Sequence, residues 1–363
     1  MEAQVPENLI RFIRSGKKFI IAGHKEPDGD CVGSQLALCS ALGRLGKKVI
    51  ACSAGPFKRT EINPFASSFV SRLSAEEQEE AAVILLDCST AERTGDLAPF
   101  LKGLPLAVVD HHAQAAGDGV VQPASSSSPA GGRHVTGDRP LFGDQAPLLY
   151  LDITAPSVTF MILRIIQALG MEPNREEAEL LLFGLCTDTG FFRHVDDTGA
   201  AVFEAAADMI RAGANPKQVF AWIHGGKSLN SRILMGLVLA RSQAHFGGKL
   251  VLSWETFEES QKYGLEGRDS DSLYQMFQSV DGAEAICIIR QETPENCTVG
   301  LRSRDKVDVS AIAAEFGGGG HKNASGFSYS GKIEELRPKL LEAFKKVFQG
   351  EAFPKLQFFG KQP

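Results

Sequence analysis

The 363-residue sequence lacks the features that mark several common classes of protein. It has no run of about eighteen apolar residues, so no membrane-spanning helix is predicted. Its first residues lack the positive start and apolar stretch of a signal peptide, so we expect a cytoplasmic protein with no membrane partner. Its seven cysteines include no Cys-x-x-Cys pair, which indicates reduced small side chains rather than a zinc-cysteine site.

Several nucleotide-binding and hydrolase signatures are also missing. There is no GxxxxGK[ST] loop, and no GxGxxG follows the first predicted strand, so a P-loop and a dinucleotide cofactor are disfavoured. The absence of GxSxG disfavours a serine hydrolase. The net charge of −6, from 44 acids and 38 bases, disfavours tracking along nucleic acid but permits a small anionic substrate.

The first half of the chain alternates strand and helix patterns. Continuous apolar runs, typical of strands covered on both faces, occupy 17–23, 47–54, 81–89 and 104–112. Helical spacing follows at 32–46, 156–170, 175–187 and 198–212. We therefore predict an α/β fold with a mostly parallel, doubly wound sheet. Strand patterns from about 244 and an amphipathic helix at 333–348 predict a smaller C-terminal α+β domain.

Changes in composition give the predicted domain boundaries. We expect an N-terminal domain over 1–225, a linker over 226–243, a second domain over 244–350 and a loose tail over 351–363. Within the first domain, 113–147 is rich in Ser, Gly and Pro, which is typical of a surface insertion.

Acids and imidazoles follow the predicted strands of the N-terminal domain. They are His24, Asp28 and Asp30 after the first strand, Asp87 after the third, Asp110, His111 and His112 after the fourth, and Asp188 after the helix at 175–187. Ligands of open α/β sheets bind at the carboxyl ends of the strands, so these groups are predicted to meet at one edge. Carboxylates and imidazoles suit manganese, zinc or magnesium, and two divalent ions would relieve the repulsion between so many acids.

Each group taken alone has an ordinary structural interpretation. A single Asp after a strand, such as Asp87 or Asp188, is usually a helix cap or turn residue. Asp28-Gly29 is a turn signal, and a lone histidine is more often structural than a ligand. The three polar groups Asp110, His111 and His112 at the end of a buried run are costly without partners, so the metal interpretation is preferred.

A second group of candidate residues lies in the C-terminal domain. Gly317 to Gly320 precede His321, and such a backbone could approach a ligand closely and cradle a phosphate. Arg302 and Arg304 alternate to one face of a predicted strand, and a guanidinium matches phosphate oxygens. The ordinary alternatives are a flexible turn and a solvated strand face.

The motifs together resemble those of the DHH phosphoesterase superfamily. The four N-terminal motifs read GHKEPDGDCVGS, LLDCS, VVDHH and CTDTGFFR, and the C-terminal one reads GLRSRDKVDVSAIAAEFGGGGHKNASGF. The resemblance implies a DHH domain, a DHH-associated substrate-binding domain, an active site in the cleft between them and two manganese ions. Within the superfamily the chain is most similar to bacterial nanoRNases, and its insertion after Asp110-His111-His112 is longer than that family's usual connection.

Residue roles are carried over from the resemblance by position. One ion would be held by His24, Asp28 and Asp87, and the other by Asp30, Asp87, His111 and Asp188. Asp110 would support the neighbouring imidazoles, and His112 would face the scissile phosphate. Substrate phosphate or nucleoside would contact Arg302, Gly318, Gly319, Gly320, His321 and Arg193.

The resemblance implies hydrolysis of very short oligoribonucleotides to mononucleotides. It also implies removal of the 3′-phosphate from 3′-phosphoadenosine 5′-phosphate (PAP). The expected partners are short RNA or small nucleotides, and relatives form homodimers. Hydrolysis of linear or cyclic dinucleotides is an alternative within the superfamily. A RecJ-type exonuclease normally has more chain, and a manganese pyrophosphatase has a different second domain. From another class, a nucleotide-binding regulator with an idle metal site stays open, although every motif position keeps its ligand.

Overall fold

The computed structural model describes residues 4–112, 146–195, 199–264, 268–304 and 306–349. The chain divides into two compact units, Met1–Gly226 and Lys227–Pro363. Within the described residues, no helix combines the length and the apolar character that crossing a membrane would require.

A parallel sheet of five strands, in the order β2-β1-β3-β4-β5, forms the centre of the first unit. Its strands are β1 (Lys18–Gly23), β2 (Lys48–Cys52), β3 (Ala81–Leu86), β4 (Leu106–Asp110) and β5 (Leu148–Leu151). The strands are parallel, so their carboxyl ends share one edge. The chain leaves β1 first toward β2 and then crosses to β3 on its other side, which creates a switch point of the kind where α/β sheets bind ligands.

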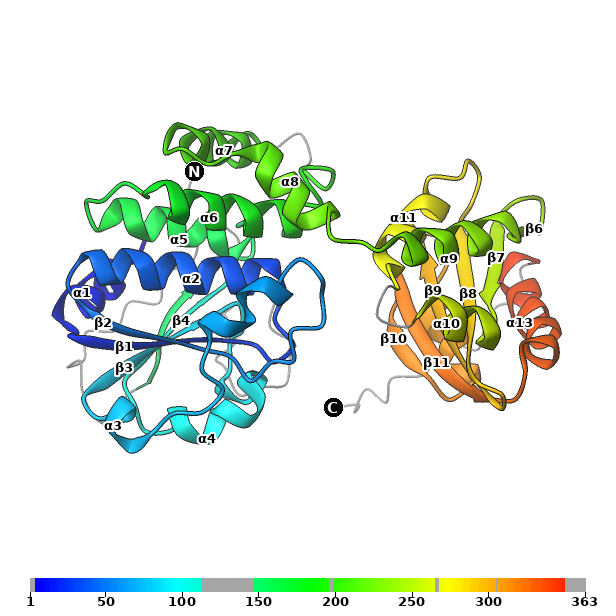
Figure 1. The fold of residues 1–363 in the computed structure, drawn as a ribbon, viewed down its shortest axis with the longest axis horizontal. Coiled ribbons are helices and arrows are strands. Elements are labelled where there is room, and N and C mark those ends of the chain that lie inside the picture. The colour runs from blue at the N-terminus through cyan, green and yellow to red at the C-terminus, as the bar shows by residue number, and fades with distance from the viewer. Residues whose placement is uncertain (1–3, 113–145, 196–198, 265–267, 305, 350–363) are drawn as a thin grey trace, which may run out of the picture. The chain divides into compact units, whose positions relative to one another are not determined.

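Helices cover both faces of this sheet (Figure 1). On one face α1 (Glu7–Ser15), α2 (Gly29–Arg44), α5 (Val158–Ala168) and α6 (Arg175–Asp188) bury a core that includes Phe19 and Ile21. The intervening residues Ile20 and Ala22 point into the opposite core, near α3 (Ala75–Gln78) and α4 (Ala98–Leu101). Short 3₁₀ helices lie at Asn63–Ser68 and Ala91–Leu97, and α7 (Ala200–Arg211) and α8 (Pro216–His224) pack outside α6.

Two glycines allow α2 and α6 to approach closely. A Cβ atom on Gly33 would lie 2.5 Å from the carbonyl oxygen of Leu180, and one on Gly184 would lie 3.0 Å from Cα of Asp30. Both positions therefore need a residue without a side chain. The close approach brings the first turn of α2, which carries Asp30, against the helix that ends at Asp188.

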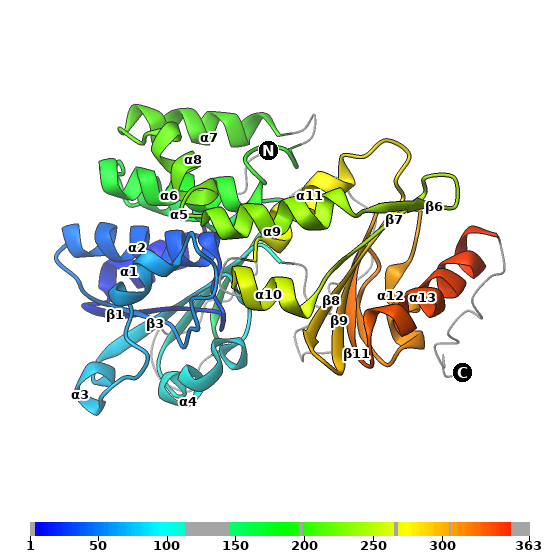
Figure 2. The ribbon, with the colours of Figure 1, turned by 45° about the vertical axis from the view of Figure 1, so that its right-hand side comes forward.

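The second unit has a mixed six-stranded sheet in the order β10-β11-β9-β8-β7-β6. Its strands are β6 (Gln243–His245), β7 (Leu250–Glu255), β8 (Ala285–Thr293), β9 (Asn296–Ser303), β10 (Gly319–His321) and β11 (Ala324–Ser330). The helices α9 (Leu229–Ala240), α10 (Phe257–Tyr263) and α11 (Ser270–Gln278) cover one face, and α12 (Val309–Glu315) and α13 (Ile333–Phe348) cover the other (Figure 2). Separate apolar clusters fill the two sides.

The fold class predicted from the sequence is confirmed: a parallel α/β sheet is followed by a second, mixed α+β unit. The sequence patterns did not reveal the short strands β5, β6 and β10, or β11. Residues 226–243, predicted as a linker, contain α9, whose Met235 and Val238 pack in a core of the second unit. Most of the predicted insertion (113–145) and the predicted tail (351–363) lie outside the described residues.

Candidate metal centre

Three neighbouring strands end at one cluster of acids and imidazoles. His24 directly follows β1, Asp87 directly follows β3, and Asp110 is the last residue of β4, with His111 and His112 after it. The ends of two helices complete the cluster, because Asp28 and Asp30 lie at the start of α2 and Asp188 is the last residue of α6. The structure thus brings together all the acids and histidines that the sequence placed at this edge.

The two aspartates of α2 are fixed by hydrogen bonds to backbone nitrogens. Asp28 caps the helix and accepts a hydrogen bond from the backbone nitrogen of Cys31 at 3.1 Å. Asp30 is fully buried, and its Oδ2 accepts from the backbone nitrogen of Val158 at 2.5 Å. Its Oδ1 accepts from the backbone nitrogen and the hydroxyl of Thr159, at 2.8 and 2.7 Å. The first turn of α5 therefore sets the position of this carboxylate.

Asp87 lies at the centre of the cluster. Its Oδ2 is 3.3 Å from Nε2 of His24, and its Oδ1 is 3.4 Å from Nδ1 of His112 and 3.8 Å from Nε2 of His111. Its backbone has a φ of 59°, in the left-handed region that non-glycine residues rarely adopt. The hydrogen bond from its backbone nitrogen to the carbonyl of Val109 in the neighbouring strand holds it there, at 3.1 Å. Strained backbone of this kind is concentrated at functional sites.

Each imidazole of the cluster uses Nδ1 to contact a fixed acceptor. Nδ1 of His24 donates to the carbonyl of Lys25 at 2.9 Å, and Nδ1 of His111 donates to the carbonyl of Ala155 at 3.1 Å. Nδ1 of His112 lies 2.8 Å from Oδ1 of Asp110. Histidines that bind metals are commonly oriented through one nitrogen in this way. For His24 and His111 the arrangement leaves Nε2 directed toward the acids, 3.3 Å from Oδ2 of Asp87 and 3.2 Å from Oδ2 of Asp188 respectively.

Burial and crowding change the proton affinities of the cluster. Burial, together with the charges of Asp188 and Asp87, raises the pKa of Asp30 well above its ordinary value. Burial also raises the pKa of Asp87 to about 6, against the opposing effect of His24. Burial would lower the pKa of His111, but the carboxylate of Asp188 and its neighbours raise it to about 9. The acids therefore repel one another and favour positive charge between them.

The residues fit divalent metal ions. Three sets of side chains each bring their ligand atoms within 4.8 Å of one another: His24, Cys31 and Asp87; Asp87, His111 and His112; and Asp30, His111 and Asp188. Within the described part of the chain, Oδ1 of Asp87 and Nε2 of His111 are buried and make no hydrogen bond of good geometry, although Nε2 lies 3.2 Å from Oδ2 of Asp188. Carboxylate oxygens and imidazole nitrogens gathered at one place are ligands that manganese, zinc and magnesium accept.

The thiol of Cys31 is a member of this cluster that was not predicted from the sequence. The cysteine pattern predicts only small apolar side chains, whereas Sγ of Cys31 faces His24 and Asp87. Burial raises the pKa of this thiol to about 12, and Sγ contacts Oε1 of Gln35 at 3.5 Å. The position of Cys31 between Asp30 and the body of α2 was the only signal in the sequence.

The remaining predicted residue of the first unit is Arg193, in the turn that follows Asp188. Its side chain is exposed, and one of its terminal nitrogens lies 3.4 Å from Nε2 of His194. A Cβ atom on Gly190 would lie 2.7 Å from that same Nε2 and 3.2 Å from the guanidinium. Arg193 and His194 therefore both fold over the glycine of this turn.

The substrate residues predicted in the second unit lie on β9 and on the segment from Gly318 to His321, which contains β10. The guanidinium of Arg302 lies 4.5 Å from the ring centroid of Tyr274, while Arg304 bonds the carbonyl of Gln278. Gly319, Gly320 and His321 form the exposed strand β10, and Gly318 precedes it. This segment is a short strand, although the sequence permitted a flexible turn.

Three glycines of this sheet lie side by side on adjacent strands. Gly319 pairs with Gly326 of β11, which pairs with Gly300 of β9. A Cβ atom on Gly300 would lie 2.0 Å from the hydroxyl of Tyr274, whereas one on Gly319 would meet nothing within 4 Å. The sheet therefore presents bare backbone near Arg302, covered by Tyr274 at one end and open at the other.

Comparisons with known proteins agree with this division of the chain. Residues 18–185 match the model of the DHH family, N-terminal domain, and residues 245–350 match that of the DHHA1 domain. The solved structure of an exopolyphosphatase-related protein from Bacteroides fragilis superposes with a TM-score of 0.74 at 22% identity, and the match covers 95% of each chain. At this level of identity the similarity establishes the fold.

Curated relatives align over most of the chain. The bifunctional oligoribonuclease and PAP phosphatase NrnA of Thermus thermophilus is 28% identical, covering 90% of this chain and 89% of the relative. The protein of the same name from Bacillus subtilis is 26% identical over 88% of this chain and 92% of its own length. With both domain models matched in order, the chain belongs to the DHH family, as a DHH N-terminal domain followed by a DHHA1 domain.

Proposed function

We propose that the protein is a two-metal phosphoesterase that hydrolyses very short oligoribonucleotides to mononucleotides and converts 3′-phosphoadenosine 5′-phosphate to AMP. The observation that carries this proposal is the cluster in which Asp87 lies within 3.8 Å of three imidazoles while Asp30 and Asp188 crowd the same edge of the sheet. So many carboxylates at one place favour bound cations. The chain has a candidate ligand at every position that the resemblance assigns to a metal ion.

The proposed ligands of one manganese ion are His24, Asp28 and Asp87, and those of the other are Asp30, Asp87, His111 and Asp188. Asp87 would serve both. Cations bound there supply the charge that polarises a phosphoryl group and lowers the pKa of water. The neighbouring His112 is suited to contact the phosphoryl oxygens, because Asp110 fixes its Nδ1 and nearly half of its side chain is exposed.

The second unit is proposed to bind the nucleotide. Arg302 provides a planar guanidinium, and the exposed strand with Gly318, Gly319, Gly320 and His321 provides backbone that a ligand can approach closely. Arg193 of the first unit is proposed as a further phosphate contact. The named activities of the two curated relatives, which align over most of their length, support short RNA and PAP as substrates.

A second candidate function is hydrolysis of a linear or cyclic dinucleotide. The cyclic-di-AMP phosphodiesterase GdpP of Geobacillus thermodenitrificans is 22% identical over 96% of this chain, although the match covers only 51% of that protein. The same metal cluster would serve both reactions, so the difference lies in substrate binding.

A product time course on manganese-loaded protein tests the proposal. The panel contains an RNA dinucleotide, a short RNA of a few nucleotides, a long RNA, PAP and a cyclic dinucleotide. We expect rapid conversion of the two shortest RNAs to mononucleotides and release of phosphate from PAP, with the long RNA spared. Preference for the cyclic compound would favour the second candidate, and no turnover of any substrate would refute the phosphoesterase assignment.

A further inference from the structure

Five aromatic rings form a continuous row in the first unit. They come from the turn that follows Asp188 and from the helices α7 and α8. We call Phe203, Phe192, Phe191, Phe220 and His224 the aromatic row. From Phe203 to His224, the successive ring centroids are 5.3, 5.6, 5.2 and 4.4 Å apart. Phe191 and Phe192 belong to the turn, Phe203 belongs to α7, and Phe220 and His224 belong to α8.

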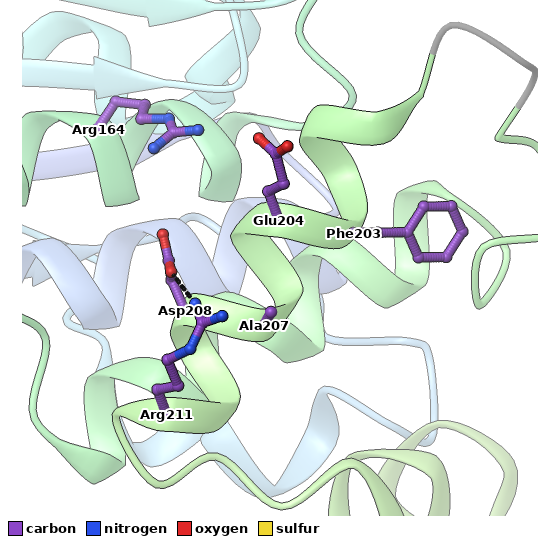
Figure 3. Close-up of a pocket in the computed structure, with 6 residues that line it drawn as sticks. All are labelled: Arg164, Phe203, Glu204, Ala207, Asp208 and Arg211. Carbon is purple, nitrogen blue, oxygen red and sulfur yellow. Dashed lines mark hydrogen bonds and ion pairs between the residues drawn. The ribbon is translucent and has the colours of Figure 1, made fainter.

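The two ends of the row are open to solvent, while Phe191 and Phe192 between them are partly buried against the core. The side chain of Phe203 is 54% exposed and that of Phe220 is 51% exposed. Figure 3 shows the ring of Phe203 pointing away from the charged side of α7, where Arg164, Asp208 and Arg211 lie around a shallow pocket. Phe203 also lines one edge of this pocket, together with the neighbouring Glu204, and its ring extends beyond that edge. Exposed aromatic side chains that gather on one surface commonly mark a binding site.

The turn that presents the row is strained. Gly190, Phe191 and Phe192 have consecutive φ values of 56°, 56° and 68°. A glycine adopts this conformation freely, whereas a phenylalanine does not. The backbone nitrogen of Phe191 donates to the carbonyl of Cys186 at 2.6 Å, and that of Phe192 donates to the hydroxyl of Thr189 at 3.1 Å. These bonds hold two aromatic side chains in an unfavourable backbone conformation three and four residues beyond Asp188.

The groups beside the row favour a ligand that has both a flat ring and a negative charge. Arg193 and His194 follow Phe192 directly, are exposed, and fold over Gly190 of the same turn. The residue two positions before Gly190 is Asp188, a proposed metal ligand. A purely apolar partner would leave the guanidinium and the imidazole unused at the edge of the rings. A nucleotide satisfies both, because its base has a π-face and its phosphate is anionic.

We propose that the aromatic row is a nucleobase-binding subsite, in which a base of the substrate stacks on Phe203 or Phe220 while its phosphate lies toward Arg193. This inference rests on the proposed nucleotide phosphoesterase function. Stacking on aromatic rings tolerates every base, so the subsite would contribute affinity with little sequence preference. It would also distinguish nucleotides from phosphate esters that carry no ring.

Steady-state kinetics on an RNA dinucleotide and two matched analogues test this subsite. The first substrate is an RNA dinucleotide. The two analogues each lack the base of one of its two nucleotides. The proteins are the wild type, Phe203→Ala, Phe220→Ala and the ring-preserving Phe203→Tyr. Ile210→Ala is the matched control, because Ile210 is a 46% exposed apolar residue of the same helix outside the row.

We expect at least one of the two Ala variants to raise KM for the dinucleotide about ten-fold while kcat changes little, as for the loss of one stacked base. For the wild type, KM should rise by a similar factor when one of the two abasic analogues replaces the dinucleotide. For the affected Ala variant, the same replacement should raise KM much less. Phe203→Tyr and Ile210→Ala should retain the KM of the wild type.

Equal efficiency of the wild type on dinucleotide and abasic analogues would overturn the subsite and leave the phosphoesterase function standing. Failure of the wild type on all of these substrates would instead refute the proposed function. If Phe203→Ala and Phe220→Ala change the molecular mass by light scattering while the base has no effect on KM, the row is a contact between copies and the proposal is wrong.

Discussion

Oδ1 of Asp30 accepts hydrogen bonds from both the backbone nitrogen and the hydroxyl of Thr159, 129 positions later in the chain. This contact links the start of α2 to the start of α5 at the proposed metal centre. Thr159→Val keeps the shape and the backbone bond but removes the hydroxyl. Loss of such a supporting contact is expected to weaken metal binding roughly 10- to 100-fold.

Isothermal titration calorimetry of Thr159→Val with manganese measures this effect. Thr94→Val is a matched control, because Thr94 is also buried but its hydroxyl bonds the carbonyl of Ala91 instead. Unchanged affinity in Thr159→Val would mean that the hydroxyl does not orient Asp30.

Asp87→Ala should remove bound metal and turnover together, because the proposed centre uses this carboxylate for both ions. Metal content per protein and hydrolysis of an RNA dinucleotide are measured on the same preparation. The circular dichroism of the metal-free variant checks that it is folded. Full activity in Asp87→Ala would rule out the two-metal assignment.

Asp110→Asn should lower kcat while metal content stays close to that of the wild type. The carboxylate of Asp110 holds Nδ1 of His112 at 2.8 Å, and the neutral amide would orient the ring less strongly. We expect a loss in kcat on the order of 10- to 100-fold. Asp152→Asn is the control, because the side chain of Asp152 accepts hydrogen bonds from the backbone nitrogen and the hydroxyl of Thr154 and contacts no imidazole of the cluster among the described residues. A kcat equal to that of the wild type would exclude a role for the Asp110–His112 pair.

His321→Ala should weaken nucleotide binding and leave metal content unchanged, since His321 lies in the second unit. The expected result is a higher KM for the dinucleotide at normal manganese stoichiometry. His245→Ala, in the same sheet but on β6, provides a comparison. Loss of metal in His321→Ala would contradict the assignment of the metal centre to the first unit.

Removing divalent ions with a chelator should lower the melting temperature. Without cations the acids around Asp87 repel one another, and a ligand at about 100 times its dissociation constant stabilises the native state by about 2.7 kcal/mol. Differential scanning calorimetry with and without manganese measures the shift. In Asp87→Ala the same addition should change the melting temperature much less.

The parts of the fold that could be predicted are those encoded by local pattern. The runs that form β1 to β4 are apolar on both faces, and the parallel arrangement then places the residues after them at one edge. The strand β5, Leu-Leu-Tyr-Leu, is also apolar, but it has only four residues and follows the Ser-rich stretch, so its pattern was too short to predict a strand. The strand β10 is formed by Gly319 to His321, a composition that locally favours a turn.

The candidate site was predictable to the extent that it depends on residue type and position after a strand. Whether Cys31 faces the acids depends on how α2 crosses α6, and the sequence does not specify that crossing. The aromatic row was missed for a similar reason: Phe191, Phe203 and Phe220 come from three segments, and their ring contacts arise only when α7 and α8 pack beside the turn.

The acceptors that orient the imidazoles differ in how they respond to mutation. The carbonyls of Lys25 and Ala155, which hold His24 and His111, are main-chain groups that any replacement at those positions retains. The acceptor that holds His112 is the side chain of Asp110, which a single nucleotide change can alter. Evolution can therefore vary the residue proposed to face the substrate, while the orientation of the two proposed metal-binding histidines is protected from most substitutions.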